Sequence, residues 1–419
     1  MPDAGQNVSG LVDHLFRTSA GQMVSYLTRV LGPAHLDLAE EAVQDALVKA
    51  LQTWPYGTVP DNPAGWLLQV ARNRALDLVR HRGMAAAKSA EIVNELTRVH
   101  VTSEPDVRDQ LRDDELRMIF LCCHPDISRD GRVALSLKTV SGFSVEEIAR
   151  AFLAEPATIA QRLVRAKRQI REANIRFELP PAKELAPRLD SVLEAIYLLF
   201  NEGYAAHAGE DLIRQDLCAE ALRLAMLVAE SPIADPRCHA LVALLALQAA
   251  RIPARVDENG ELVLLEHQDR SKWDRQLLML GHYHLAASAE GETISSYHVQ
   301  AGIASMHAHA PDPESTDWDG ILLLYDDLLA LNPSAVVALN RAIAVSKVRG
   351  PEAALREIAL IQDDPALANY YLLPATRGRL LAELGEREAA AKSFREALNR
   401  KCSEPERRFL LRRLAECEL

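Results

Sequence analysis

Residues 144–171 constrain the fold more than any other stretch, because they predict two helices joined by a tight turn. In the first helix apolar residues recur at spacings of three and four positions, which places Val145, Ile148, Ala149 and Phe152 on one face. Pro156 suits the first position of the second helix, where an amide hydrogen would have no partner. In that second helix the apolar residues also share one face, and they are Ile159, Leu163, Ala166 and Ile170.

The opposite face of the second helix carries hydrogen-bonding and cationic side chains, namely Thr158, Gln161, Arg162, Arg165 and Arg168. Five basic and no acidic residues fall between Pro156 and Arg171. A helix that buries one side and presents such side chains on the other suits the major groove of DNA. The alternative is an ordinary helical hairpin with a solvated basic face.

The distribution of charge allows a nucleic-acid partner for the first part of the chain only. The 419 residues are too many for one core and predict two or three domains. The net charge is −12, but residues 1–180 hold 22 basic and 23 acidic side chains, whereas 181–419 hold 25 and 36. Positive charge gathers at 72–88 and 162–176, and residues 91–115 are acidic. Because the local field governs approach to phosphate, the basic clusters suit DNA and the acidic C-terminal part suits protein.

The six cysteines indicate a reducing compartment. They show no C-x-x-C spacing, and neighbouring ligands such as Cys122 and Cys123 cannot easily close a tetrahedral metal site. No stretch reaches the ~18 uninterrupted apolar residues of a membrane helix, and the N-terminus lacks a basic-then-apolar signal. We therefore expect a cytoplasmic protein without a metal, a cofactor or a membrane partner.

Breakers divide the first part of the chain into segments. Residues 9–83 read as helices separated by Gly32-Pro33 and by a loop at 55–63. Residues 84–112 form a polar, acidic linker, and 113–178 form a compact helical unit that ends in the helix-turn-helix. Pro180-Pro181 marks the next boundary.

From residue 182 onward the chain is helical and rich in alanine and leucine. Asn259-Gly260 predicts one small β-hairpin within 255–266, because both turn residues need positive φ. Gly350 and Gly385 lie 35 residues apart, close to the ~34-residue period of tetratricopeptide repeats. Other small and aromatic residues fall on positions of that repeat: Gly378, Ala390, Phe394 and Ala397. We expect a helical extension over 182–334, tetratricopeptide-like repeats over 335–419, and an all-α fold class overall.

Three segments, in this order, resemble a known family. Residues 37–46 look like region 2.2 of the extracytoplasmic-function sigma factors of bacterial RNA polymerase, a branch of the sigma-70 family. Residues 65–80 look like regions 2.3 and 2.4, and the helix-turn-helix resembles region 4. The resemblance covers about residues 10–176. The remaining residues resemble the subfamily with a long C-terminal extension of tetratricopeptide character, through the phrases at 121–125, 199–204, 268–270, 316–318 and 339–342.

The resemblance implies a partner and a set of contact residues. Residues 9–83 would be the region 2 helical bundle, which binds core RNA polymerase at the clamp helices of its largest subunit, while the flap would be a further polymerase contact. The helix that docks there carries carboxylates and apolar residues, a mix that suits a basic helical partner. Its expected contact residues are Asp37, Glu40, Glu41, Gln44, Asp45, Leu47 and Val48. A solvated acidic face is the alternative reading.

The resemblance also implies two contacts with promoter DNA. Region 2 would hold the melted −10 strand, where aromatic rings stack on exposed bases and basic groups bind phosphates. The candidates are Trp54, Tyr56, Trp66, Arg72, Asn73, Arg80 and Arg82, although Trp54 and Trp66 can equally be core residues. Region 4 would read the −35 element, with Gln161 and Arg162 at base edges, Arg165 and Arg168 at phosphates, and Thr158 at the helix start.

Other functions remain open at this point. A helix-turn-helix regulator that binds operators by itself, with a ligand-sensing helical domain, is the first alternative, although it has no use for a strand-melting unit. Residues near 201–204, 266–273 and 317–318 can line a ligand site, or simply cap helices. An enzyme within 182–419 is the second alternative, with candidate ligands or bases at His282, His284, His298, His307 and His309. Helical metal sites prefer histidines four residues apart, whereas these pairs are spaced by two. We therefore expect no enzyme, and an extension that regulates activity through contacts within the chain or with other proteins.

Overall fold

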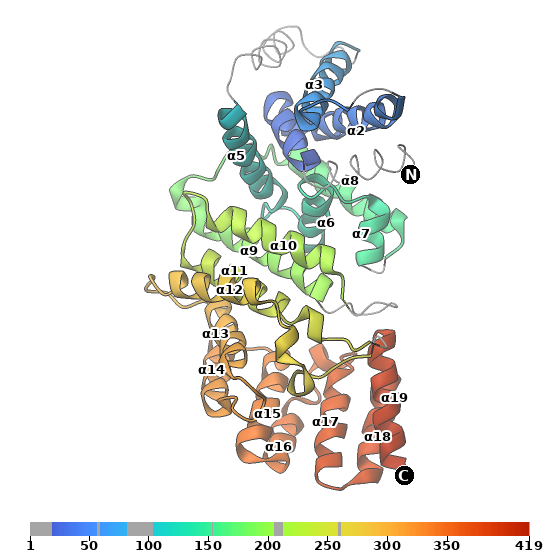
Figure 1. The fold of residues 1–419 in the computed structure, drawn as a ribbon, viewed down its shortest axis with the longest axis vertical. Coiled ribbons are helices and arrows are strands. Elements are labelled where there is room, and N and C mark those ends of the chain that lie inside the picture. Colours follow the sequence, from blue (N-terminus) through green and yellow to red (C-terminus); the bar gives the residue numbers. More distant parts are fainter. Residues whose placement is uncertain are drawn as a thin grey trace. The chain divides into compact units, whose positions relative to one another are not determined.

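The fold is built from helices in two compact units. The computed structural model describes residues 19–56, 59–81, 104–152, 154–204, 213–258 and 261–418 (Figure 1). One unit is Met1–Ala195 and the other is Ile196–Leu419, and the division falls inside helix α9 (Ala182–Tyr204). Among the described residues the β pairing is limited to one antiparallel bridge, between Val256 and Leu262. The predicted all-α fold class is confirmed.

The first unit begins with a pair of packed helices. Residues 19–31 are helical, and the chain turns at Gly32, whose φ of 87° favours glycine. The 3-10 turn η1 (Pro33–His35) leads into α2 (Leu36–Thr53), and η2 (Trp54–Tyr56) follows. Helix α3 (Pro63–His81) starts with a proline, as helices often do, and packs against α2. Both helices bury alanine and leucine side chains at helical spacing.

The remaining helices of the first unit are α5 (Glu104–Cys122), α6 (Arg129–Thr139), α7 (Val145–Ala151) and α8 (Pro156–Glu172). A capping box starts α7, because the Ser144 hydroxyl accepts from the Glu147 amide at 3.0 Å and the Ser144 amide donates to the Glu147 carboxylate at 2.8 Å. Helix α8 packs on α6 and α7. Its buried residues are Ile159, Leu163, Ala166 and Ile170, the four that periodicity predicted.

The first part of α9 belongs to this unit. Arg188 donates to the carbonyl of Phe120 at 2.8 Å, and Glu194 pairs with Arg129 at 2.8 Å and with Arg132 at 3.3 Å. The division between the units therefore lies beyond the boundary expected at Pro180-Pro181. The prolines precede a helix whose first turns still contribute to the first unit.

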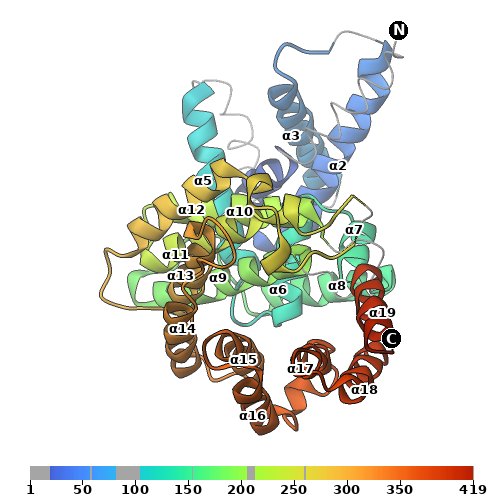
Figure 2. The ribbon, with the colours of Figure 1, turned by 60° about the horizontal axis from the view of Figure 1, so that its bottom comes forward.

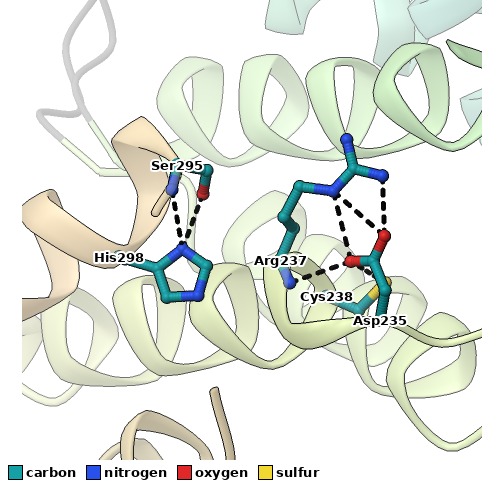
Figure 3. Close-up of polar contacts among 5 residues, drawn as sticks. All are labelled: Asp235, Arg237, Cys238, Ser295 and His298. Atoms are coloured by element: carbon teal, nitrogen blue, oxygen red, sulfur yellow. Dashed lines mark hydrogen bonds and ion pairs between the residues drawn. The ribbon is translucent and has the colours of Figure 1, made fainter. Parts of the chain in front are cut away.

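The second unit surrounds an almost completely buried helix, α11 (Pro236–Ala249), on which α10 (Gln215–Ala229), α12 (Arg275–Ser288) and α13 (Ser296–His309) pack. Polar caps fix two of these helices (Figure 3). Asp235 accepts from the amide of Arg237 at 2.9 Å and pairs with its guanidinium. His298 Nδ1 lies 3.0 Å from the Ser295 amide nitrogen. Because Nδ1 accepts there, His298 Nε2 carries the hydrogen that faces the Ser288 carbonyl at 3.2 Å.

Between α11 and α12 the chain runs through η4 (Ile252–Ala254), η5 (Leu265–His267) and η6 (Arg270–Lys272). The predicted hairpin occurs here as the single bridge of Val256 and Leu262, with the Val263 amide donating to the Arg255 carbonyl at 2.8 Å. Its expected turn, Asn259-Gly260, lies outside the described residues.

The C-terminal helices follow one another along a curve (Figure 2). They are α14 (Trp318–Leu331), α15 (Ala335–Arg349), α16 (Pro351–Ile361), α17 (Leu372–Glu383), α18 (Arg387–Leu398) and α19 (Glu404–Glu418), with the turn η7 (Pro365–Leu367) before α17. Each packs on the next. Gly350 and Gly385 separate α15 from α16 and α17 from α18, with φ of 84° and 79°. At Gly378 an added Cβ would lie 3.0 Å from the Phe394 ring, so a small residue is needed where α17 meets α18.

Candidate nucleic-acid interface

The outward face of α8 carries the side chains that the sequence assigned to DNA. Thr158, Gln161, Arg165 and Arg168 are exposed. Arg162 is half-buried and lies 3.4 Å from the carboxylate of Asp130 at the start of α6. The buried residues of α8 hold this face outward, so the cationic side chains are supported by a packed helix rather than by a loop.

The edge of α8 forms a charge cluster with α2, which the sequence analysis missed. Lys167 donates to Glu40 at 2.6 Å and to Asp37 at 2.7 Å, and Arg171 lies 3.4 Å from Asp37. The side chains of Lys167 and Glu40 are 13% and 17% exposed. Burial lowers the pKa of Lys167, but the carboxylates of Glu40 and Asp37 outweigh it, so the pKa is raised and the ammonium stays charged. These partners are more than 120 positions apart in sequence, so no local pattern pairs them.

The rest of α2 presents carboxylates beside exposed apolar side chains. Asp45 accepts from Arg74 of α3 at 2.5 Å, and Glu41 lies 3.8 Å from the same guanidinium. Gln44 is exposed, and Val48 and Leu51 are 45% and 42% exposed although both are large and apolar. Leu51 was not among the predicted contacts, but it follows Gln44 and Val48 at helical spacing.

Leu47, a predicted contact on α2, is only 5% exposed and belongs to the core. It immediately precedes Val48, and one position turns the side chain by about 100° around the helix. The apolar residues of this face that can meet a partner are therefore Val48 and Leu51 rather than Leu47.

The aromatic candidates of the first unit are packed together. Trp54 is 3% exposed, its ring centroid lies 5.3 Å from that of Trp66, and its indole nitrogen is buried without a partner among the described residues. Trp66 is half-buried. In this structure Trp54 is therefore a core residue, the alternative to a base-stacking role.

The polar candidates on α3 differ in accessibility. Arg72 is 3% exposed and lies against Gln69, 3.4 Å away, which leaves its guanidinium turned away from solvent. Asn73 and Arg80 are exposed, and Asn73 accepts from Gln69 at 3.1 Å. Arg82 and the side chain of Tyr56 lie outside the described residues. Of the predicted strand-binding groups, Asn73 and Arg80 are thus the ones seen at the surface.

Histidines and cysteines elsewhere form pairs rather than larger clusters. The Nδ1 atoms of His239 and His284 lie 2.9 Å apart, and the rings of His282 and His309 are 4.4 Å apart. Within the described ranges, no group of three or more His, Cys, Asp or Glu is arranged to hold a metal ion. Cys122 and Cys123 are buried at the end of α5, and burial raises the pKa of Cys123 to about 11. None of the helices in the described part is long and apolar enough to cross a membrane.

Comparison with known proteins agrees with the geometry of the first unit. Residues 15–84 match the family model for sigma-70 region 2, and residues 188–289 match a family of unknown function, DUF6596. The probable ECF RNA polymerase sigma factor SigI of Mycobacterium tuberculosis is 26% identical over 173 residues, which are 41% of this chain and 58% of that protein. No solved structure matches the chain.

One relative matches along nearly the whole chain. An uncharacterized protein of Rhizobium meliloti, R00370, is 41% identical over 396 residues, covering 93% of this chain and 92% of that protein. The match therefore includes the second unit as well as the sigma-70 module. The chain belongs to the same family as this Rhizobium meliloti protein, and it is a sigma factor of the extracytoplasmic-function type.

Proposed function

We propose that the chain directs core RNA polymerase to specific promoters, with α7 and α8 forming a helix-turn-helix that reads the −35 element. The observation that supports this most directly is the exposed face of α8, where Gln161, Arg165 and Arg168 stand beside half-buried Arg162. Bases in the major groove are read by such bidentate and cationic side chains. The −10 element would meet α3, where Asn73 and Arg80 are exposed.

The polymerase contact in this proposal is the face of α2 that carries Asp37, Glu40, Glu41, Gln44, Asp45 and Val48, with Leu51 added. Carboxylates flanking exposed apolar residues suit a basic helical partner such as the clamp helices of the largest subunit. Because polymerase acts in the cytoplasm, this role also places the protein there.

The second unit would regulate the first. Its curved succession of helices, with Gly350 and Gly385 at equivalent turns, supports a tetratricopeptide-like architecture. Repeats of this kind offer a concave surface to other protein segments. We infer that the extension gates promoter access through contacts within the chain or with a protein partner.

The promoter assignment is tested with Arg162→Ala in run-off transcription with core polymerase on a library of −35 sequences. We expect a loss of about 1–3 kcal/mol in promoter recognition and relaxed preference at one position. Arg176→Ala is the matched control, because Arg176 is an exposed cation just beyond α8. An unchanged sequence preference in Arg162→Ala would refute the assignment. Tight binding of promoter duplex without polymerase would instead favour a stand-alone regulator.

A further inference from the structure

The second unit contains a cavity of about 630 Å³ that the role in transcription does not use. Helices α13, α14, α15, α17, α18 and α19 all contribute to its walls, and residues 264–267 and Arg270 also line it. Its lining includes apolar and aromatic side chains, among them Trp318, Ile343, Phe394 and Phe409. Ligand pockets for small molecules span roughly 300–1,000 Å³ and combine such a lining with a few polar groups.

Four polar side chains line this cavity with no hydrogen bond to any described residue. They come from four different helices: His307 from α13, Tyr325 from α14, Asn340 from α15 and Thr376 from α17. His307 and Thr376 are each only 7% exposed. Tyr325 and Asn340 are half-buried, and polar groups of this kind in a pocket lining can offer hydrogen bonds to a molecule bound in the cavity.

The charges around the cavity favour an anion. Its lining includes Arg270, Lys347, Arg379 and Arg413 but only two carboxylates, Glu266 and Glu314. Arg270 donates to the carbonyl of His307 at 2.8 Å and to the Thr316 hydroxyl at 3.3 Å. Its guanidinium is therefore engaged in holding neighbouring segments of the protein together.

The other three cations lie on α15, α17 and α19 and pair with carboxylates. Lys347 pairs with Glu266 at 2.6 Å, Arg379 with Glu383 at 2.7 Å and Arg413 with Glu416 at 2.5 Å. Glu383 and Glu416 do not line the cavity. Pairs of this kind are partly solvated and give up little when an anion approaches.

We propose that this cavity binds a small molecule with an apolar, aromatic-sized body and one anionic group, which Lys347 and Arg379 recognise. The body would lie against Trp318 and Phe394. The polar groups of His307, Tyr325, Asn340 and Thr376 would supply hydrogen bonds that fix its orientation. The volume of about 630 Å³ lies within the range of small-molecule pockets, and this favours a small molecule over an extended peptide. The inference does not depend on the promoter or polymerase contacts.

The test uses two fluorescent probes that share a ring system and differ in charge. 8-Anilino-1-naphthalenesulfonate carries a sulfonate, whereas N-phenyl-1-naphthylamine is neutral. We expect the full chain to bind one sulfonate probe by calorimetry, and to bind the neutral probe at least about tenfold more weakly. The double variant Lys347→Gln, Arg379→Gln should lose the tenfold preference. Arg395→Gln is the matched control, because Arg395 pairs with Glu418 away from the cavity and should leave binding unchanged.

A second variant separates loss of the site from loss of the fold. Ala375→Trp fills the cavity from α17 and should abolish binding of both probes while the melting temperature is retained. Binding that survives Ala375→Trp, or equal affinity for the two probes, overturns the proposal. Displacement of the sulfonate probe by an equimolar peptide with the sequence of residues 261–266 also overturns it, in favour of a peptide groove.

Discussion

At the scale of single residues, His307 makes the stability of the second unit depend on pH. Its ring packs edge-on against Trp318, with centroids 5.3 Å apart. Burial, followed by the charges of Arg251 and Arg270, lowers the pKa of His307 to about 4. An unfolded histidine titrates near pH 6.5, so the unfolded state takes up a proton first as the pH falls. Stability is therefore full above about pH 6.5 and declines toward pH 4.

Replacing His307 by glutamine should flatten this dependence by up to about 1.4 kcal/mol per pH unit within that window. Urea unfolding of the full chain at several pH values measures it. His267→Gln is the control, because the His267 side chain is 71% exposed. Equal pH slopes for His307→Gln and the unsubstituted chain would contradict the buried, neutral imidazole.

For single residues, helical periodicity predicted which side chains are buried better than it predicted which candidate DNA-binding side chains are accessible. The four buried residues of α8 follow from spacing alone, and so does the exposure of Gln161 and Arg165. Spacing could not place Arg72 or Trp54, because whether a side chain on a helix edge turns inward depends on what packs beside it. In the sequence, only the polar groups near residues 266–273 and 317–318 indicated a ligand site. The cavity itself could not be predicted, because its walls come from six helices that only the tertiary fold brings together.

At the scale of elements, α2 and α8 hold each other through the carboxylates that we assign to polymerase. Lys167 forms ion pairs with both Asp37 and Glu40, at 2.7 and 2.6 Å. A basic partner helix that binds these carboxylates must therefore displace the Lys167 ammonium. Lys167→Gln should therefore raise the affinity for core polymerase, measured without DNA, by several-fold. It should also lower the melting temperature, because Glu40 then loses its cation and Asp37 keeps only Arg171.

Arg165→Gln is the matched control for this prediction, since it also removes a cation from α8 but one that is exposed and is not part of these ion pairs. Its affinity for core polymerase should equal that of the unsubstituted chain. If folded Lys167→Gln binds polymerase no better than Arg165→Gln does, Asp37 and Glu40 are not the polymerase contact.

At the scale of the whole molecule, the two units divide inside α9 rather than at Pro180-Pro181, where the sequence suggests a boundary. Gly32-Pro33 separates the helix over 19–31 from α2 as predicted, because breakers act locally. The division inside α9 depends instead on long-range pairs, such as Arg188 with the Phe120 carbonyl and Arg129 with Glu194. A truncation designed from Pro180-Pro181 would remove support that the first unit needs.

Comparing two truncated chains separates the stabilisation of the first unit by the start of α9 from regulation by the second unit. The chain 1–195 keeps every contact of the first unit, whereas 1–180 lacks Arg188 and Glu194. We expect 1–180 to melt at a lower temperature than 1–195, because it loses a charge-assisted hydrogen bond and two ion pairs. If the second unit gates promoter access, run-off transcription by 1–195 should differ from that of the full chain by at least about fivefold at equal polymerase occupancy. Equal transcription by 1–195 and the full chain would remove the regulatory role while leaving the sigma-factor assignment intact.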